Sequence, residues 1–172
     1  MLIPTRILTA RLRRWRTGLG FGVHSPFAYY FITRVLRERL PYYDFERLPE
    51  ISGRQIRSRN ARMIYRLSAF FRPDTVYVAG EHSEAALAIV TLAHPSARAV
   101  STPETAQMAI YAGSDTTPAA AAREVTVILS ADSDAISGFR TSLSEGMTFF
   151  NSKTAVAVIR HGLPRQDFCL KF

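Results

Sequence analysis

The first 72 residues carry the hydrophobic periodicity of α-helices. Apolar side chains recur at helical spacing from residue 1 to 17, and arginines fill most of the positions between them, which predicts an amphipathic basic helix. Ser25 and Pro26 are typical of a helix cap and first helical position, and they predict a second helix with an aromatic stripe. The same periodicity predicts a third basic helix from Ile56 to Phe71.

After residue 73 the pattern changes to short apolar runs separated by alanine-rich stretches. We predict strands at three of these runs, residues 75–79, 97–101 and 124–129. We predict helices at the stretches that follow them, residues 83–93, 103–111 and 132–143. Strands that alternate with helices form parallel sheets with helices on both faces. The pattern therefore predicts an α/β, Rossmann-like fold.

The last 26 residues have a different pattern, with strands and no helix between them. Apolar runs at 154–159 and 167–172 are joined by a short, turn-like segment, His161 to Pro164, and together they predict a C-terminal antiparallel hairpin. A further strand is expected near Met147 to Phe150. The sequence thus predicts a shortened sheet of about three parallel strands plus the hairpin, with this further strand beside them.

Charge divides the chain at the place where the pattern changes. Residues 1–72 carry 15 arginines, no lysine and 4 acidic residues, a net charge of +11, whereas residues 73–172 have a net charge of −3. We therefore predict a basic helical N-terminal extension, 1–72, and a shortened Rossmann-like domain, 73–172. A segregated basic half predicts an acidic partner, such as nucleic acid, anionic lipid or an acidic protein. The alternative is that these arginines lie on solvated helix faces and pair with the acidic half.

Composition excludes several kinds of site. Cys169 is the single cysteine and the four histidines show no ligand spacing, so neither an intramolecular disulfide nor a metal site is predicted. No apolar run approaches the roughly 20 residues that cross a bilayer. The N-terminus lacks the apolar segment and cleavage site of a signal peptide. The sequence therefore predicts a soluble, cytoplasmic protein.

Three stretches of the chain resemble a known family. They are Gly20-Phe21-Gly22-Val23-His24-Ser25-Pro26-Phe27 with Tyr42-Tyr43, the segment from Met63 to Gly80, and the segment from Gly162 to Phe172. They resemble a bacterial branch of the class I S-adenosylmethionine-dependent methyltransferases, which has an N-terminal G-x-G-V-H-S-P-F signature. The resemblance implies a methyltransferase-type sheet, with seven strands in a full domain, and an S-adenosylmethionine site after the first strand.

The resemblance also indicates which residues would lie at that site. In the family the first strand ends in an acidic residue before a glycine-rich turn, and the next helix N-terminus favours the carboxylate of the cofactor. Val78 stands here where that acid is expected. This chain has Val78-Ala79-Gly80-Glu81-His82-Ser83-Glu84 there, with one glycine and two glutamates. Glu104, after the second predicted strand, stands near the position of the acid that binds ribose hydroxyls. The cofactor-binding candidates are Gly80, Glu81, Ser83 and Glu104.

Three further residues are candidates for the substrate side. Asp132 and Asp134 follow the strand predicted at 124–129, at the edge where parallel sheets bind ligands, and could orient a substrate amine or a metal ion. The alternative for Asp132 is a helix cap, a position that aspartate favours. His24 is either a base or a structural hydrogen-bonding group. No residue is identified as catalytic.

The departures from the family pattern decide the predicted function. One glycine and two crowding glutamates predict an eroded site for S-adenosylmethionine, and hence a methyltransferase-like pseudoenzyme, weak or inactive, retained as a binding or structural protein. Two alternatives remain open. The chain could be an active methyltransferase of unknown acceptor, or a basic adaptor that binds nucleic acid or an anionic membrane surface through residues 1–72. Homodimerisation through the apolar stripe of the first helix is also open.

Overall fold

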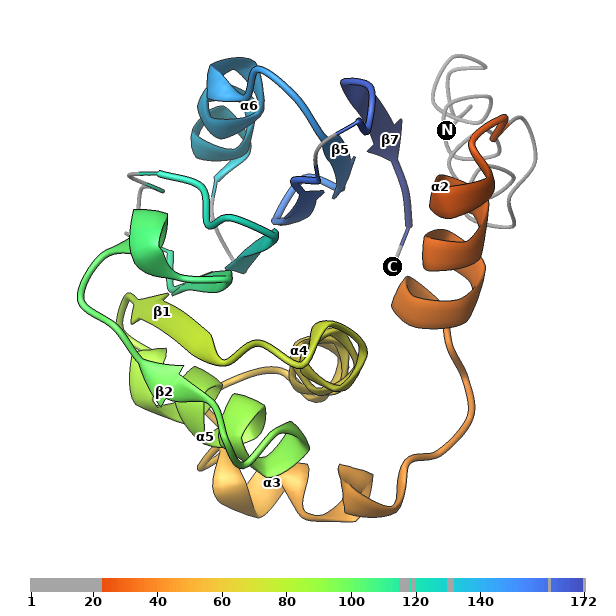
Figure 1. Cartoon of the computed structure of the whole chain (residues 1–172). Helices are drawn as coiled ribbons and strands as arrows, with labels where there is room; N and C mark the ends of the chain where they lie inside the picture. The colour runs from red at the N-terminus through yellow and green to blue at the C-terminus, as the bar shows by residue number, and fades with distance from the viewer. Residues whose placement is uncertain (1–22, 115–117, 119, 130–131, 161, 172) are drawn as a thin grey trace, which may run out of the picture.

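The chain forms a seven-stranded sheet with helices on both faces (Figure 1). A computed structural model describes residues 23–114, 118, 120–129, 132–160 and 162–171. The basic helix predicted at residues 1–17, and with it the surface considered for homodimerisation, lies outside the described residues. The strands are β1 (Thr75–Ala79), β2 (Arg98–Ala99), β3 (Met108–Ala112), β4 (Val125–Leu129), β5 (Met147–Phe150), β6 (Thr154–Val158) and β7 (Gln166–Cys169).

Local sequence signals account for most of the helices. Ser25 caps the first described helix, because its hydroxyl accepts the N–H of Ala28 at 3.3 Å. The helices predicted from periodicity at 56–71, 83–93 and 132–143 are confirmed within a few residues. The helical segments are α2 (Pro26–Phe31), the π-helical η1 (Ile32–Leu36), the 3₁₀ helix η2 (Tyr43–Glu46), α3 (Leu48–Ile51), α4 (Ser58–Phe71), α5 (Ser83–Ala93), the 3₁₀ helix η3 (Pro103–Thr105) and α6 (Ser133–Ser142).

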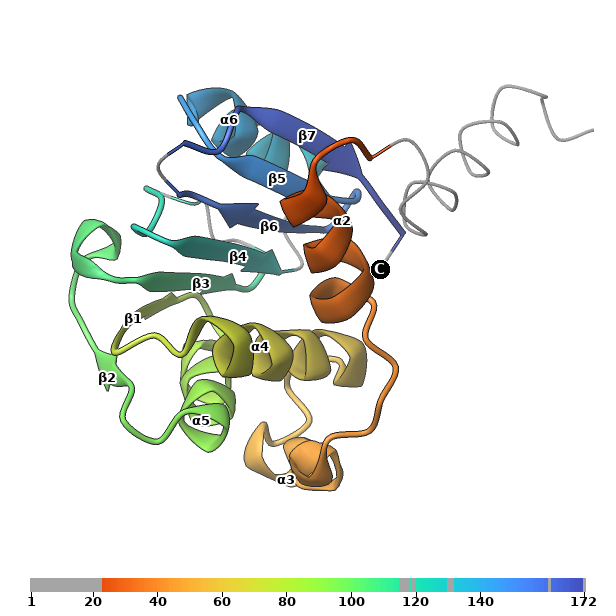
Figure 2. The same ribbon diagram turned by 45° about the vertical axis from the view of Figure 1, so that its right-hand side comes forward.

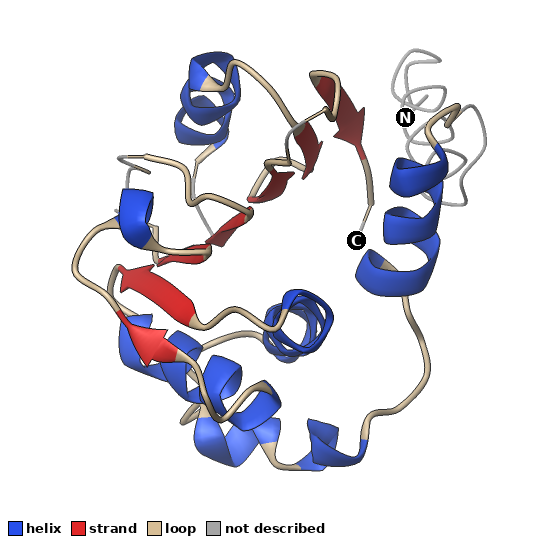
Figure 3. Ribbon diagram, viewed as in Figure 1, coloured by secondary structure: helices blue, strands red, loops and turns tan. Residues whose placement is uncertain are grey.

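The sheet is mostly parallel, with the order β2-β1-β3-β4-β6-β5-β7. Strands β2, β1, β3 and β4 are parallel neighbours, and β5 and β7 run in the same direction as they do. Strand β6 runs antiparallel to both of its neighbours, β4 and β5. Figure 3 shows the strands as one continuous twisted layer among the helices. This α/β arrangement is compatible with a Rossmann-like fold.

The C-terminal hairpin joins different strands from those predicted. The prediction paired 154–159 with 167–172, whereas β6 pairs with β5, and β7 lies on the far side of β5. Asn151 turns the chain between β5 and β6, since its side-chain carbonyl accepts the N–H groups of Lys153 and Thr154. All five residues of β6 are buried, and its two edges pair with β4 and β5, so no edge is left for β7.

The helix predicted at 103–111 is also wrong. Its first residues form the short η3, and Met108 to Ala112 form the fully buried strand β3 between β1 and β4. Methionine and alanine favour helices in isolation, but pairing on both edges decides the outcome here. The strand predicted at 97–101 is reduced to the exposed β2. With seven strands present, the strand count gives no sign of a shortened sheet.

The helices pack in two layers. On one face, α2, η1, α4 and α5 cover buried residues of β1, β3, β4, β5 and β6. On the other face, α6 packs Ile136 and Phe139 against Tyr111, Ile128 and small residues of the sheet. Figure 2 shows α6 on the side of the sheet away from α2 and α4. Segments on both sides of residue 72 therefore contribute to the first core, although they differ in charge.

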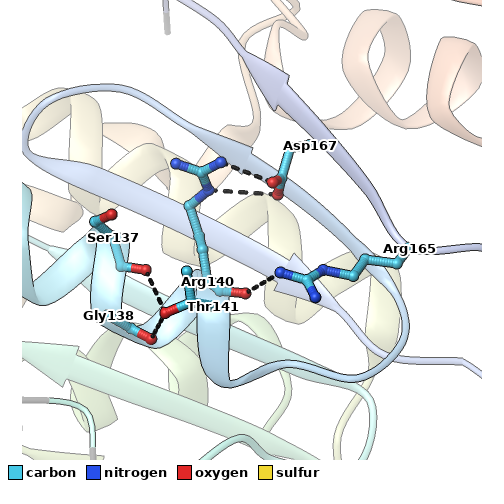
Figure 4. A network of polar contacts seen from close by, with 6 residues as sticks. All are labelled: Ser137, Gly138, Arg140, Thr141, Arg165 and Asp167. Atoms are coloured by element: carbon cyan, nitrogen blue, oxygen red, sulfur yellow. Dashed lines mark hydrogen bonds and ion pairs between the residues drawn. The ribbon is translucent and has the colours of Figure 1, made fainter.

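An exposed polar network ties α6 to the edge strand β7 (Figure 4). The guanidinium of Arg140 donates from Nε and Nη2 to the two carboxylate oxygens of Asp167, at 3.3 and 2.7 Å. The same guanidinium lies 3.7 Å from the ring centroid of Phe150. Arg165 Nη2 donates to the backbone carbonyl of Arg140 at 3.3 Å. A bidentate pair that also stacks on a ring fixes the position of α6 better than a single exposed ion pair does.

Candidate functional sites

The turn after β1 brings three of the four cofactor-binding candidates together. Gly80 has a φ of +100°, a conformation that residues with a Cβ rarely adopt. The N–H of Ser83 donates to the Gly80 carbonyl at 3.1 Å, and the N–H of His82 donates to the carbonyl of Ala112, at the end of β3, at 3.0 Å. Gly80, Glu81 and Ser83 thus lie in one tight turn at the carboxyl edge of the sheet.

The electrostatics of this turn disfavour a carboxylate ligand. Oε1 of Glu81 lies 3.2 Å from Nε2 of His82, in an exposed pair that contributes little to stability. Glu84 adds a second acidic side chain in the first turn of α5, where no side chain caps the helix. Negative groups near a helix N-terminus compensate its dipole. An incoming carboxylate therefore meets two like charges at the place where the dipole alone would attract it.

The structure does not bring Glu104 to this turn. Strand β2 has only two residues, which lie level with Thr75 and Val76 at the start of β1. The chain then returns through η3, where the Thr105 carbonyl lies 3.4 Å from the Thr75 hydroxyl. Glu104 is therefore near the amino end of β1, whereas Gly80 follows the carboxyl end of that strand, roughly 16 Å from Thr75 at about 3.3 Å per residue.

Asp132 and Asp134 lie on the same edge of the sheet as Gly80, after β4. The carboxylate of Asp132 accepts the N–H of Ala135 at 2.7 Å, so the interpretation of Asp132 as the cap of α6 is confirmed. Asp134 is exposed in the first turn of that helix. Since β3 separates β1 from β4, the two turns are about 10 Å apart across the sheet.

His24 belongs to the opposite end of the sheet. It is exposed and precedes Ser25, the cap of α2, and it forms no hydrogen bond or ion pair with another described residue. Helix α2 packs over β5, because the rings of Phe31 and Phe149 lie 4.9 Å apart. Strands β3, β4 and β6 separate β5 from β1. The structure therefore does not place His24 beside Gly80. Among the described residues, no three His, Cys, Asp or Glu side chains gather closely enough for a metal ion.

A second polar region, missed by the sequence analysis, lies between α4 and the segment from Glu38 to Pro49. A groove of about 1040 Å³ opens there, and we call it the arginine groove. Its basic residues Arg59, Arg62 and Arg66 lie on one face of α4, at spacings of three and four, and Arg39 faces them from the segment. The rest of its lining is Glu38, Pro41, Tyr42, Tyr43, Phe45, Glu46, Pro49 and Ser58. The spacing of the arginines can be read from the sequence, but the position of the segment that completes the groove cannot.

Arg66 is the buried arginine of the groove lining. Its side chain donates to the backbone carbonyls of Leu36 and Glu38, which anchors the end of η1 to α4. It is 9% exposed, its Nε has no hydrogen-bond partner among the described residues, and burial lowers the pKa of Arg66 from its usual value. The positive charge is thus held in the fold by carbonyl groups, and Arg66 forms no ion pair with a carboxylate of the described residues.

Tyr65, whose ring contacts Tyr42 and Phe45 of the groove lining, gives a testable pH dependence. The hydroxyl of Tyr65 donates to the Asp44 carboxylate at 2.8 Å, and burial together with this bond raises the pKa of Tyr65 from 10.0 to about 12. The folded state then holds this proton more tightly than the unfolded chain. The resulting stability is complete below pH 10 and is lost as the pH rises through 12. Urea denaturation across this range should show the loss.

The control for that experiment is Tyr65→Phe, which removes the titrating hydroxyl. We expect the variant to lose less stability than the native chain as the pH rises through the same range, with tyrosinate absorbance reporting the titration. Tyr43→Phe, at an exposed ring, should leave the native dependence unchanged. Equal pH dependence in the native chain and Tyr65→Phe would contradict the prediction.

Comparisons with known proteins add no family to these observations. The chain matches no protein-family model, no curated protein and no solved structure. Within the part of the chain that the structure describes, no helix is both long and apolar enough to span a membrane. The turn after β1 and the arginine groove are therefore the two regions from which a function can be inferred.

Proposed function

We propose that this chain is a methyltransferase-like protein whose S-adenosylmethionine site is eroded, and that it works as a binding protein with weak or no catalysis. The observation that carries the proposal is the turn after β1. It retains the positive φ of Gly80 but places Glu81 and Glu84 at the start of α5. The geometry for close backbone approach is present, while the charge opposes the cofactor's carboxylate.

Two further features support the methyltransferase-like part of the proposal. The resemblance implies a sheet of seven strands, and the sequence predicts an antiparallel hairpin near its C-terminal end. The sheet has seven strands, and its antiparallel strand, β6, lies in the last part of the strand order. The first described residues, including the Ser25 cap and Phe27, pack helix α2 onto the same core. The described part of the N-terminal signature, Val23 to Phe27, would then belong to the folded domain.

Titration calorimetry with S-adenosylmethionine and S-adenosylhomocysteine tests the proposal. We expect no saturable heat and no thermal shift at millimolar ligand. The double variant Glu81→Gln/Glu84→Gln removes both charges and should bind more tightly than the native chain, because the α5 dipole is then available to the ligand carboxylate. Saturable micromolar binding by the native chain would overturn the proposal and favour an active methyltransferase with Gly80, Glu81 and Ser83 beside the cofactor.

A second candidate function, a basic adaptor for an acidic partner, has its own supporting observation. Ten arginines lie between residues 23 and 72, and of these Arg47 alone forms an ion pair within the described part of the chain, with Asp44 at 3.2 Å. The pairing of these arginines with the acidic half, considered above as an alternative, is therefore not found there. Unpaired arginines leave their donors for phosphate or carboxylate groups of a partner. Binding that weakens steeply with salt is expected.

A further inference from the structure

The arginine groove differs from the rest of the basic surface, because it brings arginines and aromatic rings together in a hollow. Two smaller hollows, of about 340 and 570 Å³, adjoin the groove, since both share Glu38 and Arg66 with it. One of them adds Arg37 and Lys171, and the other adds Arg34. Six of the ten arginines between residues 23 and 72 therefore line one concave region.

The cations of the groove are available to a ligand. Arg39, Arg59 and Arg62 are exposed, and none of them has an ion pair or a side-chain hydrogen bond to another described residue. With Arg66 they set four positive charges against Glu38 and Glu46. Planar guanidinium groups bind phosphate oxygens through two parallel N–H donors. The groove therefore favours a ligand that presents several phosphates in a row.

The aromatic side chains narrow the class of ligand. Tyr43 is 94% exposed and contacts no other ring of the described residues, so its ring is open to a ligand in the groove. The guanidinium of Arg62 lies 5.4 Å from the ring centroid of Phe45, which sets a cation over an aromatic face within the groove. Exposed rings beside arginines are the arrangement that stacks unpaired bases while the backbone follows the positive charge.

We propose that the arginine groove binds single-stranded nucleic acid, with phosphates on Arg59 and Arg62 and a base stacked on Tyr43. The inference rests on the proposed function only in so far as the chain acts by binding. Bases in a duplex are stacked on each other and offer no face to Tyr43. Among the described residues, the apolar faces of α2 and α4 are buried against the sheet, so these two helices do not offer the apolar face with which an amphipathic helix binds a membrane.

Fluorescence anisotropy with labelled RNA and DNA strands of about 12 nucleotides tests the proposal, a length within the range that such grooves cover. The full chain should bind both strands, and mononucleotides should compete weakly because they offer one phosphate. Tyr43→Ala should weaken binding about tenfold. Tyr29→Ala is the matched control, because Tyr29 is 51% exposed and does not line the groove; it should bind as the native chain does.

The arginines are tested by the salt dependence of the same measurement. Arg59→Gln/Arg62→Gln should reduce the slope of log affinity against log salt by about 1.4, since each phosphate contact to a single strand contributes about 0.7. Arg98→Gln/Arg160→Gln removes the same charge at exposed positions away from the groove, and it should retain most of the affinity and the slope.

Several outcomes would overturn the proposal. If the two double variants lost the same affinity and the same salt slope, net charge alone would attract the strand. Binding to phosphatidylserine vesicles with no binding to the strands would assign the arginines to a membrane, and no binding to either at low salt would remove the site. S-adenosylmethionine binding is measured separately, so the proposal of an eroded cofactor site and the proposal of strand binding in the groove can be refuted independently. Saturable cofactor binding with intact strand binding would refute the eroded site and leave the groove standing.

Discussion

Gly146→Ala is expected to lower the free energy of unfolding by about 3 kcal/mol or more, since strained backbone and overpacking each cost about 1–3 kcal/mol. Gly146 is buried directly before β5, and its φ is +94°. A Cβ at this position would lie 2.5 Å from the carbonyl oxygen of Val158 and 3.2 Å from the Cα of Ile159. Both contacts are with backbone on β6 or just beyond it, so neither can be relieved by a rotamer change. The β5–β6 hairpin would have to shift.

Urea denaturation checks this prediction, with Gly138→Ala as the matched control. Gly138 lies in α6, and a Cβ there would meet no atom within 4 Å. Alanine is favoured over glycine in a helix interior, so the control should gain up to about 1 kcal/mol. A Gly146→Ala chain as stable as the native chain would mean that the β5–β6 hairpin does not adopt the described register.

Phe31→Ala is expected to lower the free energy of unfolding by about 3–5 kcal/mol, the usual cost of removing a buried phenylalanine ring. Phe31 is 0% exposed. Its ring lies 5.6 Å from that of Phe27, 5.9 Å from Phe70, 6.0 Å from Phe71 and 4.9 Å from Phe149. These partners come from α2, α4 and β5, so one side chain joins the N-terminal helices to the sheet.

The control for Phe31 is Tyr29→Ala in the same helix, where half of the side chain is exposed and the change should be within about 0.5 kcal/mol. Thermal or urea unfolding measures both variants. A cooperative single transition that shifts only in Phe31→Ala would indicate that α2 and the sheet unfold together. If Phe31→Ala costs no more than Tyr29→Ala, α2 does not pack on β5 as described.

Local signals were enough to predict several elements. Each of these signals lies within one short stretch of sequence: the cap residue Ser25, the periodicity of α4 and the β-branched run of β4. A candidate site residue could be interpreted locally as well. Asp132 stands directly before a predicted helix, and its residue type there indicated the helix cap that the structure has. The turn at Gly80 could also be predicted, since a strand, a glycine and a helix follow one another directly in the sequence.

Other features depended on partners distant in the chain. The residues of β3 favour a helix by themselves and become a strand because β1 and β4 lie on either side. The shortness of β2 moved Glu104 to the amino end of β1, away from Gly80. Both errors have one cause: strand pairing is fixed by backbone hydrogen bonds between segments far apart in sequence, which no local pattern records.

The sequence by itself determined the helical faces, the caps, the alternation that makes an α/β protein, and the concentration of arginine before residue 72. Only the tertiary structure decided which strands are neighbours, that both edges of β6 are paired and leave none for β7, and that Arg59, Arg62 and Arg66 line one groove with Tyr43. The physical reason is that periodicity tells which face of an element is buried, whereas the partner of that face is chosen by packing the whole chain into one core.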